Sequence, residues 1–353
     1  MKFSDLKYLL GYTIPVCLFF SLTGHSWWLW LSPFVAFGII PVLEMQFKGH
    51  TDNLDDEEKD KVAGHLFFNA LLYLNLPIIY VLLYLSFQLI QSNSLNAFET
   101  TGLVFSLGIL LASNGINVAH ELGHKQSNLA WLTSKLLLTP CLYNHFTIEH
   151  NRGHHLHVGT PMDPATAREG ESVYAFWIRS TLESYKDAWK LEEVRISKVS
   201  GWKRFLKNEM ILNLGLTLLY ITIVGLVFGV FVMMCAILAG IISFLFLETI
   251  NYIEHYGLTR RITETGKYER VEAQHSWNSN HSIGRLILYE LTRHSDHHYK
   301  ANKEYQLLDH HDASPQLPLG YPASMLLALL PPLWFATMDK ELQKYNSLAI
   351  GSK

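Results

Sequence analysis

The stretch FNALLYLNLPIIYVLLYLSFQLI, residues 68–90, decides what kind of fold this chain adopts. It contains no Asp, Glu, Lys or Arg, and most of its side chains are aliphatic or aromatic. A helix of about 20 predominantly apolar residues is long enough to cross the hydrocarbon core of a bilayer. The stretch therefore predicts a membrane-spanning helix.

Five further stretches have the same character, and none of the six contains Lys, Arg or Asp. We predict six transmembrane helices at about 8–22, 27–46, 66–90, 101–119, 210–229 and 230–250. The first could be read as a cleaved signal peptide, but SLTGHSWW is not a small-residue cleavage site and a second apolar stretch follows at once. The chain is also only 17% charged, below the roughly 25% of average soluble proteins.

The distribution of positive charge predicts how these helices are oriented. The connections at 23–26, 91–100 and around 229 contain no Lys or Arg, so all 28 of these residues lie on the other side of the membrane. Because Lys and Arg mark the cytoplasmic face, we expect both termini to be cytoplasmic. The predicted fold is an all-α membrane protein forming one catalytic domain, 1–353, with a cytoplasmic helical cap made of 120–209 and 251–353.

The sequence lacks motifs for binding a redox cofactor other than a metal. Cys17, Cys141 and Cys235 occur singly, so no Cys-x-x-Cys iron–sulfur or rubredoxin-like module is present. No glycine-rich phosphate loop or dinucleotide fingerprint is present either. Any electrons must come from a separate partner, and we expect no nucleic acid among the partners.

Histidines are the residues that indicate function. Ten of the 18 fall in four short segments, AHELGHK, IEHNRGHHLHVGTP, NYIEHYGL and RHSDHH, all on the predicted cytoplasmic side, and nine of them, all but His157, are candidate metal ligands. These nine are His120, His124, His150, His154, His155, His255, His294, His297 and His298. Histidines that merely fill a core would have no reason to respect membrane topology, so the pattern predicts a metal-rich centre.

The number of histidines favours two metal ions. Nine ligands are too many for one ion, and neutral imidazole binds iron, zinc, copper and nickel alike. His294, His297 and His298 have the spacing i, i+3, i+4, which predicts that they share a helix face and converge on one point. HELGH also matches the zinc-protease pattern His-Glu-x-x-His, but such a site needs only one more ligand, and three more clusters are present here.

The chain resembles the integral-membrane alkane 1-monooxygenases, within the wider family of membrane di-iron desaturases and hydroxylases. The histidine boxes carry the wider resemblance. The narrower one rests on NVAHELGHK, EHNRGHHLHVGTPMDPATAREGESVY, NYIEHYGL, LTRHSDHHYKANKEYQLL and PQLPLGYPASMLLALLPPLW. Gly159 is a small departure, since an alanine is expected there.

This resemblance implies a non-haem di-iron enzyme of the bacterial inner membrane. Such an enzyme hydroxylates the terminal methyl of a medium-chain n-alkane to a 1-alkanol, using O2 and two electrons from a rubredoxin, itself reduced by an NADH-dependent flavoprotein. The nine histidines would be the iron ligands. Asp163 is a candidate tenth ligand, or alternatively a turn residue before Pro164. Glu169 and Glu171 are weaker candidates for that position.

Several neighbouring residues are expected to support the centre. Glu121, Glu254 and Asp296 would orient ligand imidazoles. Glu248 would accept a ring N–H from a ligand histidine, or else be a water-facing acid. Phe34 and Phe37 are candidates for a substrate channel. Trp27, Trp28 and Trp30 fit an interfacial aromatic belt better than such a channel.

Other features leave alternatives open. Lys190, Arg195, Lys198, Lys203 and Arg204 could steer an acidic electron donor or contact anionic lipid. His275, His281, His310 and His311 are at most supporting residues, and His25, His50 and His65 receive no role. Rival functions are a xylene-type methyl hydroxylase, a fatty acyl desaturase, a divalent-metal transporter and a bis-histidine haem protein.

Overall fold

The computed structural model describes residues 2–47 and 49–351 and is built from helices. Residues 1, 48 and 352–353 of the predicted domain lie outside the described part. Within the described residues there is no β-strand, only two isolated β-bridges, Ile262 with Tyr268 and Asn278 with Gln316. The all-α prediction is confirmed.

Five helical segments among the described residues are long and apolar enough to cross a membrane: Ser26–Gln46, Leu66–Gln91, Ala97–Gly123, Glu209–Phe228 and Val230–His255. The first three are composite. The first consists of a 3-10 turn, Ser26–Trp30, then α2 (Leu31–Phe34), a π-helical turn, Val35–Ile39, and α3 (Ile40–Gln46). The second consists of α5 (Leu66–Tyr73) and α6 (Asn75–Gln91). The third consists of α7 (Ala97–Leu110), a π-helical turn, Leu111–Ile116, and α8 (Asn117–Gly123). The last two segments are the single helices α14 (Glu209–Phe228) and α15 (Val230–His255).

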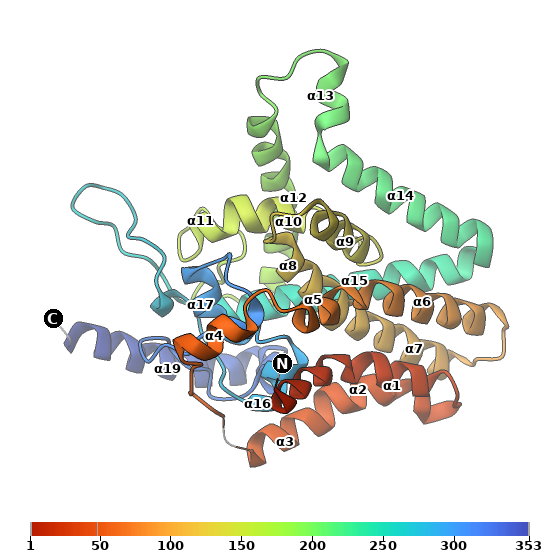
Figure 1. The fold of residues 1–353 in the computed structure, drawn as a ribbon, viewed down its shortest axis with the longest axis horizontal. Coiled ribbons are helices and arrows are strands. Elements are labelled where there is room, and N and C mark those ends of the chain that lie inside the picture. The colour runs from red at the N-terminus through yellow and green to blue at the C-terminus, as the bar shows by residue number, and fades with distance from the viewer. Residues whose placement is uncertain (1, 48, 352–353) are drawn as a thin grey trace.

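A sixth span over 8–22 is not confirmed. These residues are divided between a 3-10 helix, Phe3–Tyr12, and the nine-residue α1 (Thr13–Ser21). The charged side chains of Asp5 and Lys7 lie in the 3-10 helix and lower the hydropathy of the combined segment. α1 nevertheless packs beside α2, α6 and α7, in line with the spans (Figure 1).

The remaining helices gather mainly at one end of the spans (Figure 1). The turns that follow α1, α6 and α14 lie at the opposite end. The outer helices are α4 (Asp56–Val62), α9 (Asn128–Leu138), α10 (Phe146–Glu149), α11 (His155–His157), α12 (Val173–Arg195), α13 (Trp202–Lys207), α16 (Ser282–Ile287), α17 (His294–Tyr299), α18 (Tyr321–Ala328) and α19 (Pro331–Gly351), with short 3-10 turns at Ala273–His275 and Tyr305–Leu307.

A π-helical turn at His150–His154 shapes the site directly. The backbone N–H of His155 bonds to the carbonyl of His150, five residues earlier. An i→i+5 bond brings residue 155 over residue 150, which an ordinary α-helix would not do, and such turns recur at functional sites. The imidazole rings of His150 and His155 can therefore point toward the same place.

Position 159 requires a residue without a Cβ atom. Its φ of +73° lies in the left-handed region, and a Cβ there would come within 3.1 Å of the Arg260 side chain. Both conditions disfavour the expected alanine.

Candidate metal centre

Five histidines form the first group of donors: His120, His124, His150, His155 and His297. One ring nitrogen from each lies within 4.8 Å of all the others. The contacts run through Nε2 atoms, at 2.9 Å from His120 to His297, 3.1 Å from His297 to His155 and 3.0 Å from His155 to His150. Histidines far apart in the sequence thus direct their Nε2 atoms toward one common point.

Four histidines form a second group: His154, His255, His294 and His298. The Nε2 atoms of His154 and His298 are 3.2 Å apart, and those of His298 and His294 are 2.9 Å apart. All four residues are buried. The two groups are adjacent, since the ring centres of His155 and His298 are 4.7 Å apart.

Together the two groups use all nine predicted histidines, but not in the expected arrangement. The prediction that His294, His297 and His298 converge on one point is wrong. His297 belongs to the five-histidine group, whereas His294 and His298 belong to the other. α17 lies between the groups, and positions i+3 and i+4 differ by about 100° around a helix, so it supplies both.

The donors are suited to bind metal. The Nε2 atoms of His124 and His255 are buried and have no hydrogen-bond partner in the described residues. Burial, together with a smaller effect of the nearby His154 ring, lowers the pKa of His124 to about 4. Burial and neighbouring imidazoles also hold the pKa of His297 and His298 well below the ordinary value. Neutral imidazole is the form that coordinates a metal ion.

Asp163 lies behind one of the nine histidines instead of among the donor atoms. Its Oδ2 is 2.9 Å from Nδ1 of His154 and accepts a 2.6 Å hydrogen bond from the Thr166 hydroxyl. Neither group of donor atoms includes it. Burial alone would raise the pKa of Asp163, but the His154 ring and the Thr166 hydroxyl outweigh this and lower it. The geometry is that of a carboxylate orienting a ligand imidazole.

Glu254 lies on the donor side. Its Oε2 is 3.2 Å from Nε2 of His294, the atom that also faces His298. Its Oε1 accepts a 2.8 Å hydrogen bond from the hydroxyl of Tyr321. Tyr321 lies in the PQLPLGYPASM segment, where no motif in the sequence marks it as a functional residue.

The side chains of the other three predicted acids, Glu121, Glu248 and Asp296, make no hydrogen bond to the nine histidines. Glu248 accepts a 2.8 Å hydrogen bond from the Tyr143 hydroxyl, so its predicted contact with a ligand imidazole is wrong. Asp296 binds Lys303, His311 and the backbone N–H of Asp309, which ties down the loop after α17. Glu121 accepts from the backbone N–H of Tyr305 at 3.3 Å.

Of the weaker candidates, only His275 reaches one of the nine histidines. Its carbonyl oxygen lies 3.4 Å from Nδ1 of His255, while its ring contacts Glu269. Glu171 is paired with Arg179 at 2.7 Å, away from the donors. The remaining contacts are local: His281 with Ser279, His310 with Asn280 and Asp312, and His65 with the N–H of Phe67.

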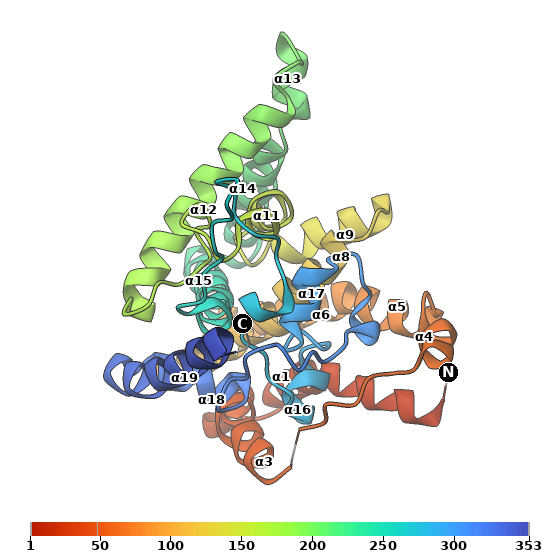
Figure 2. The same cartoon turned by 90° about the vertical axis from the view of Figure 1, so that its left-hand side faces the viewer.

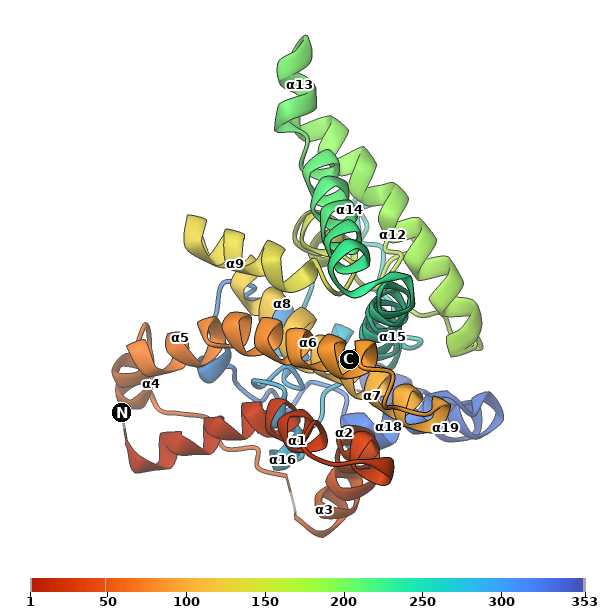
Figure 3. The same cartoon turned by 90° about the vertical axis from the view of Figure 1, so that its right-hand side faces the viewer.

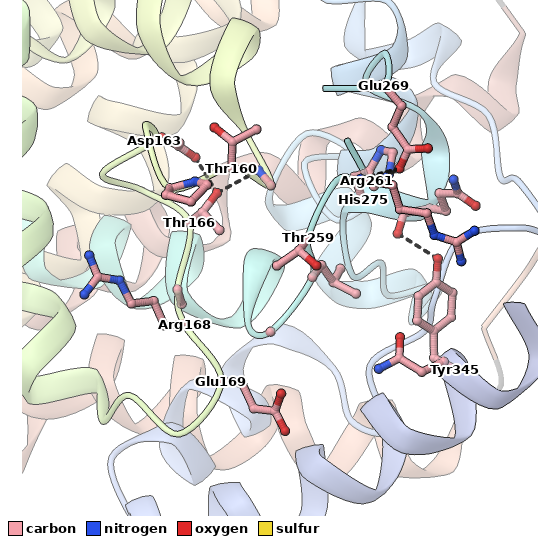
Figure 4. Close-up of a pocket in the computed structure, with 17 residues that line it drawn as sticks. Thr160, Asp163, Thr166, Arg168, Glu169, Thr259, Arg261, Glu269, His275 and Tyr345 are labelled. Atoms are coloured by element: carbon pink, nitrogen blue, oxygen red, sulfur yellow. Dashed lines mark hydrogen bonds and ion pairs between the residues drawn. The ribbon is translucent and has the colours of Figure 1, made fainter. Parts of the chain in front are cut away.

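A polar cavity of about 410 Å³ lies behind the four-histidine group. Asp163, Thr166 and Glu169 line it, with His275 and Glu269 among its other residues (Figure 4). Because Asp163 contacts His154 and the His275 carbonyl lies near His255, its walls reach two imidazoles of this group.

An apolar cavity of about 70 Å³ approaches the donors from the side of the spans. Phe37 and Tyr321 line it, and it shares Ala112, Asn117 and Ile250 with a smaller cavity of about 20 Å³. The smaller cavity is lined by His120, His150, Glu254 and His294, members of both groups and the acid between them. A continuous set of lining residues thus leads from the spans to the histidines.

The two candidate channel residues differ in position. Phe37 lines the apolar cavity, and its ring packs 5.4 Å from that of Phe246. Phe34 is 62% exposed and lies on an outer apolar surface beside Trp27, Trp28 and Trp30. Phe34 therefore lies outside the cavity, on the same surface as the three tryptophans.

Comparison with known proteins agrees with this geometry. The fatty acid desaturase family model matches residues 97–325. Alkane 1-monooxygenase 1 of Pseudomonas aeruginosa is 38% identical over 326 residues, which cover 91% of this chain and 84% of that protein. The chain belongs to the alkane 1-monooxygenase family.

Other relatives support this family assignment. Alkane 1-monooxygenase 1 of Alcanivorax borkumensis is 37% identical over 327 residues, covering 92% of this chain and 80% of its own length. The xylene/toluene monooxygenase hydroxylase component of Pseudomonas putida is 29% identical over 340 residues, covering 93% and 87%. Membership of the alkane 1-monooxygenase family makes the chain an oxidoreductase of the monooxygenase type, and its apolar helices make it a multi-pass membrane protein.

Proposed function

We propose that this protein hydroxylates the terminal methyl group of medium-chain n-alkanes to 1-alkanols, with two iron ions, O2 and electrons from a separate rubredoxin. One observation carries the proposal: two adjacent groups of imidazole donors meet an apolar cavity that leads in from the spans. The family relationship supports the same reaction.

The donor set fits a pair of irons. Five and four imidazole nitrogens leave coordination positions open on ions that accept up to six ligands, and imidazole is a suitable ligand for iron. We propose all nine histidines as the iron ligands. When bound, the irons would supply the activation of O2 and the oxidising power needed to attack a C–H bond.

The protein's own contribution is to position the substrate. An alkane offers no polar handle, so binding depends on burying CH2 groups, each worth about 0.8 kcal/mol. Primary C–H bonds are stronger than secondary ones, and attack at the chain end must therefore come from geometry. We propose that Phe37 and its neighbours hold the chain in single file, excluding water and presenting only the methyl group.

The residues around the donors would fix their orientation. We propose that Asp163 and the carbonyl of His275 hold the Nδ1 sides of His154 and His255, so that their Nε2 atoms point inward. Glu254, held by Tyr321, is the acid on the donor side and would orient His294 or the group bound beside it.

Electrons would arrive from the side away from the substrate. We propose a rubredoxin, reduced by an NADH-dependent reductase, as the donor. The polar cavity behind His154 and His255 supports this direction of approach, because all its lining residues belong to the segments 120–209 and 251–353 and its walls reach two of the nine imidazoles.

The membrane arrangement completes the proposal. We propose a single domain over 1–353 in the bacterial inner membrane, with the segment at 8–22 as a sixth span. Both termini and the cap formed by 120–209 and 251–353 would be cytoplasmic. The absence of Lys and Arg from the three connections at the opposite end supports this orientation.

Product analysis tests the proposal against its nearest rivals. The relative that acts on xylene or toluene favours methyl-group hydroxylation on an aromatic ring as the second candidate. Purified protein with donor and reductase should convert octane to 1-octanol carrying one atom from labelled O2. Preferred turnover of xylene would support the second candidate, and loss of hydrogen without oxygen gain would indicate a desaturase.

A further inference from the structure

α12 exposes a stripe of large apolar side chains. Tyr174, Ile178, Leu182 and Tyr185 are 47%, 67%, 55% and 41% exposed. Their spacing of three or four residues places them on one side of the helix. This stripe is distinct from the side buried against the protein, which includes Val173, Phe176 and Ala188 among its residues.

The third side of α12 is charged. Glu183, Lys186, Lys190 and Glu193 are all exposed and lie on the remaining side of the helix, about 100° around its axis from the apolar stripe. A helix with one protein face, one apolar face and one charged face suits a position in the plane of a membrane surface.

α13 extends the same pattern toward the bilayer. Trp202, Phe205 and Leu206 are 73%, 60% and 62% exposed. Only Asn208 separates α13 from α14, and Asn208 caps α14 by accepting from the N–H groups of Met210 and Ile211. α14 is a candidate span with 11% of its apolar window buried, so α13 ends beside the bilayer boundary. Figures 2 and 3 show α12, α13 and α14 projecting together from the rest of the molecule.

Charge on this arm distinguishes two kinds of partner. Arg204 is paired with Glu193, Arg195 with Glu192 at 2.5 Å, and Lys190 with Asp187 at 3.3 Å. Four exposed lysines have no carboxylate partner among the described residues: Lys186, Lys198, Lys203 and Lys207. They are interleaved with exposed aromatic and aliphatic side chains, which favours a lipid surface over an acidic protein.

We propose that α12 and α13 form a lipid-docking platform on the leaflet from which α14 emerges. The apolar stripe of α12 and the apolar residues of α13 enter the boundary between headgroups and acyl chains. The four unpaired lysines bind the phosphates of anionic phospholipids.

The platform also fixes the depth of the metal centre. Trp177 of α12 donates a 3.0 Å hydrogen bond to Thr249 of α15, the helix that carries His255. Arg152, between His150 and His154, pairs with Glu192 of α12 at 3.0 Å. Docking of α12 therefore holds ligands of both groups at a set distance from the bilayer surface.

Spin labels at adjacent positions test the orientation. Leu182→Cys lies on the apolar stripe and Glu183→Cys on the charged side; both are made with Cys17→Ser, because the other two cysteines are buried. In nanodiscs of phosphatidylcholine and phosphatidylglycerol, the label at 182 should collide with O2 more than with a nickel chelate and lie about 5–10 Å below the headgroups. The label at 183 should show the reverse preference. Equal access of the nickel chelate to both labels would overturn the proposal.

A second set of variants tests the headgroup chemistry. Removing phosphatidylglycerol should make the label at 182 shallower in the wild-type background. Replacing the four unpaired lysines with glutamine should abolish that dependence, whereas Lys267→Gln with Lys300→Gln, exposed elsewhere, should preserve it. If the depth of the label at 182 is the same with and without phosphatidylglycerol when all four lysines are present, the proposed role of the lysines is wrong. Shielding of the label at 182 only after an acidic electron donor is added would assign the surface to that protein. Neither readout requires turnover.

Discussion

The hydroxyl of Tyr321 donates a 2.8 Å hydrogen bond to Oε1 of Glu254, whose Oε2 lies 3.2 Å from Nε2 of His294. Tyr321 lines the larger apolar cavity, and Glu254 lines the smaller cavity beside the donors. The pair therefore joins the proposed alkane slot to the four-histidine group.

Removing this hydroxyl should slow turnover without weakening alkane binding. Tyr321→Phe keeps the ring in the slot but leaves a buried carboxylate oxygen without its donor, which costs about 1–3 kcal/mol. We expect kcat to fall by roughly 10- to 100-fold on that scale, with little change in KM for octane. Tyr252→Phe is the control, because its buried ring lies on α15, the helix that carries Glu254, but its hydroxyl donates to the Glu171 carbonyl. Equal losses in both variants would show that Tyr321 has only a structural role.

Enlarging the slot should change the preferred chain length. Phe37→Ala removes a ring from the apolar cavity, and each extra CH2 that is then buried adds about 0.8 kcal/mol, or roughly fourfold in kcat/KM. We expect the optimum to move to longer alkanes in a competition assay with a homologous series. Phe34→Ala, on the exposed surface, should leave the optimum unchanged. A shift caused by Phe34→Ala and not by Phe37→Ala would contradict the assigned route.

Replacing Asp163 should weaken the binding of iron. Asp163→Asn removes the charge behind His154, and loss of such an orienting carboxylate typically lowers metal affinity by about 10- to 100-fold. Iron content after dialysis against a chelator should fall relative to wild type. Glu171→Gln breaks the nearby ion pair with Arg179 and should retain the metal. If the Asp163 variant keeps its iron as well as wild type, the orienting role is wrong.

Lys135 allows a pH test that is independent of the metal centre. Burial lowers its pKa to about 8, although Glu209 opposes the shift. Between about pH 8 and 10.5 the unfolded chain therefore binds more protons at this position, so stability rises with pH. The stability of wild type relative to Lys135→Met should increase by on the order of 2 kcal/mol from pH 8 to 10. Thermal unfolding of both proteins in detergent measures this difference in stability. A difference that stays constant or falls as the pH rises would contradict a lowered pKa for Lys135.

The sequence predicted which histidines gather better than it predicted their surroundings. The nine could be identified because they lie near the ends of apolar stretches on one predicted side of the membrane, and because imidazole is a common metal ligand. Their division between groups could not, because it depends on a π-helical turn at His150–His154 and on α17 lying between the groups. Local spacing gives a helix face but not which neighbours that face meets.

The partners of the acidic residues near the histidines could not be predicted from local sequence either. Glu248 and Asp296 were expected beside ligands because of their sequence positions, yet their partners are Tyr143 and the Lys303–His311 loop. Glu254 does face the donors, but its link to Tyr321 joins residues 67 positions apart. Long-range packing of this kind leaves no signal in a single sequence.

The division of ligands gives its own prediction. His297 and His298 are neighbours on α17 but belong to different groups. His297→Ala and His298→Ala should therefore each weaken a different ion, giving distinct Mössbauer spectra of the remaining iron. Identical spectra from the two variants would contradict the division.

The iron content of active, purified protein is the most direct test of the central claim. Metal analysis, normalised to protein by amino-acid analysis, should give two irons per chain, because five and four imidazoles converge on two adjacent points. A preparation that hydroxylates octane with one iron per chain, or with zinc in place of iron, would contradict the account.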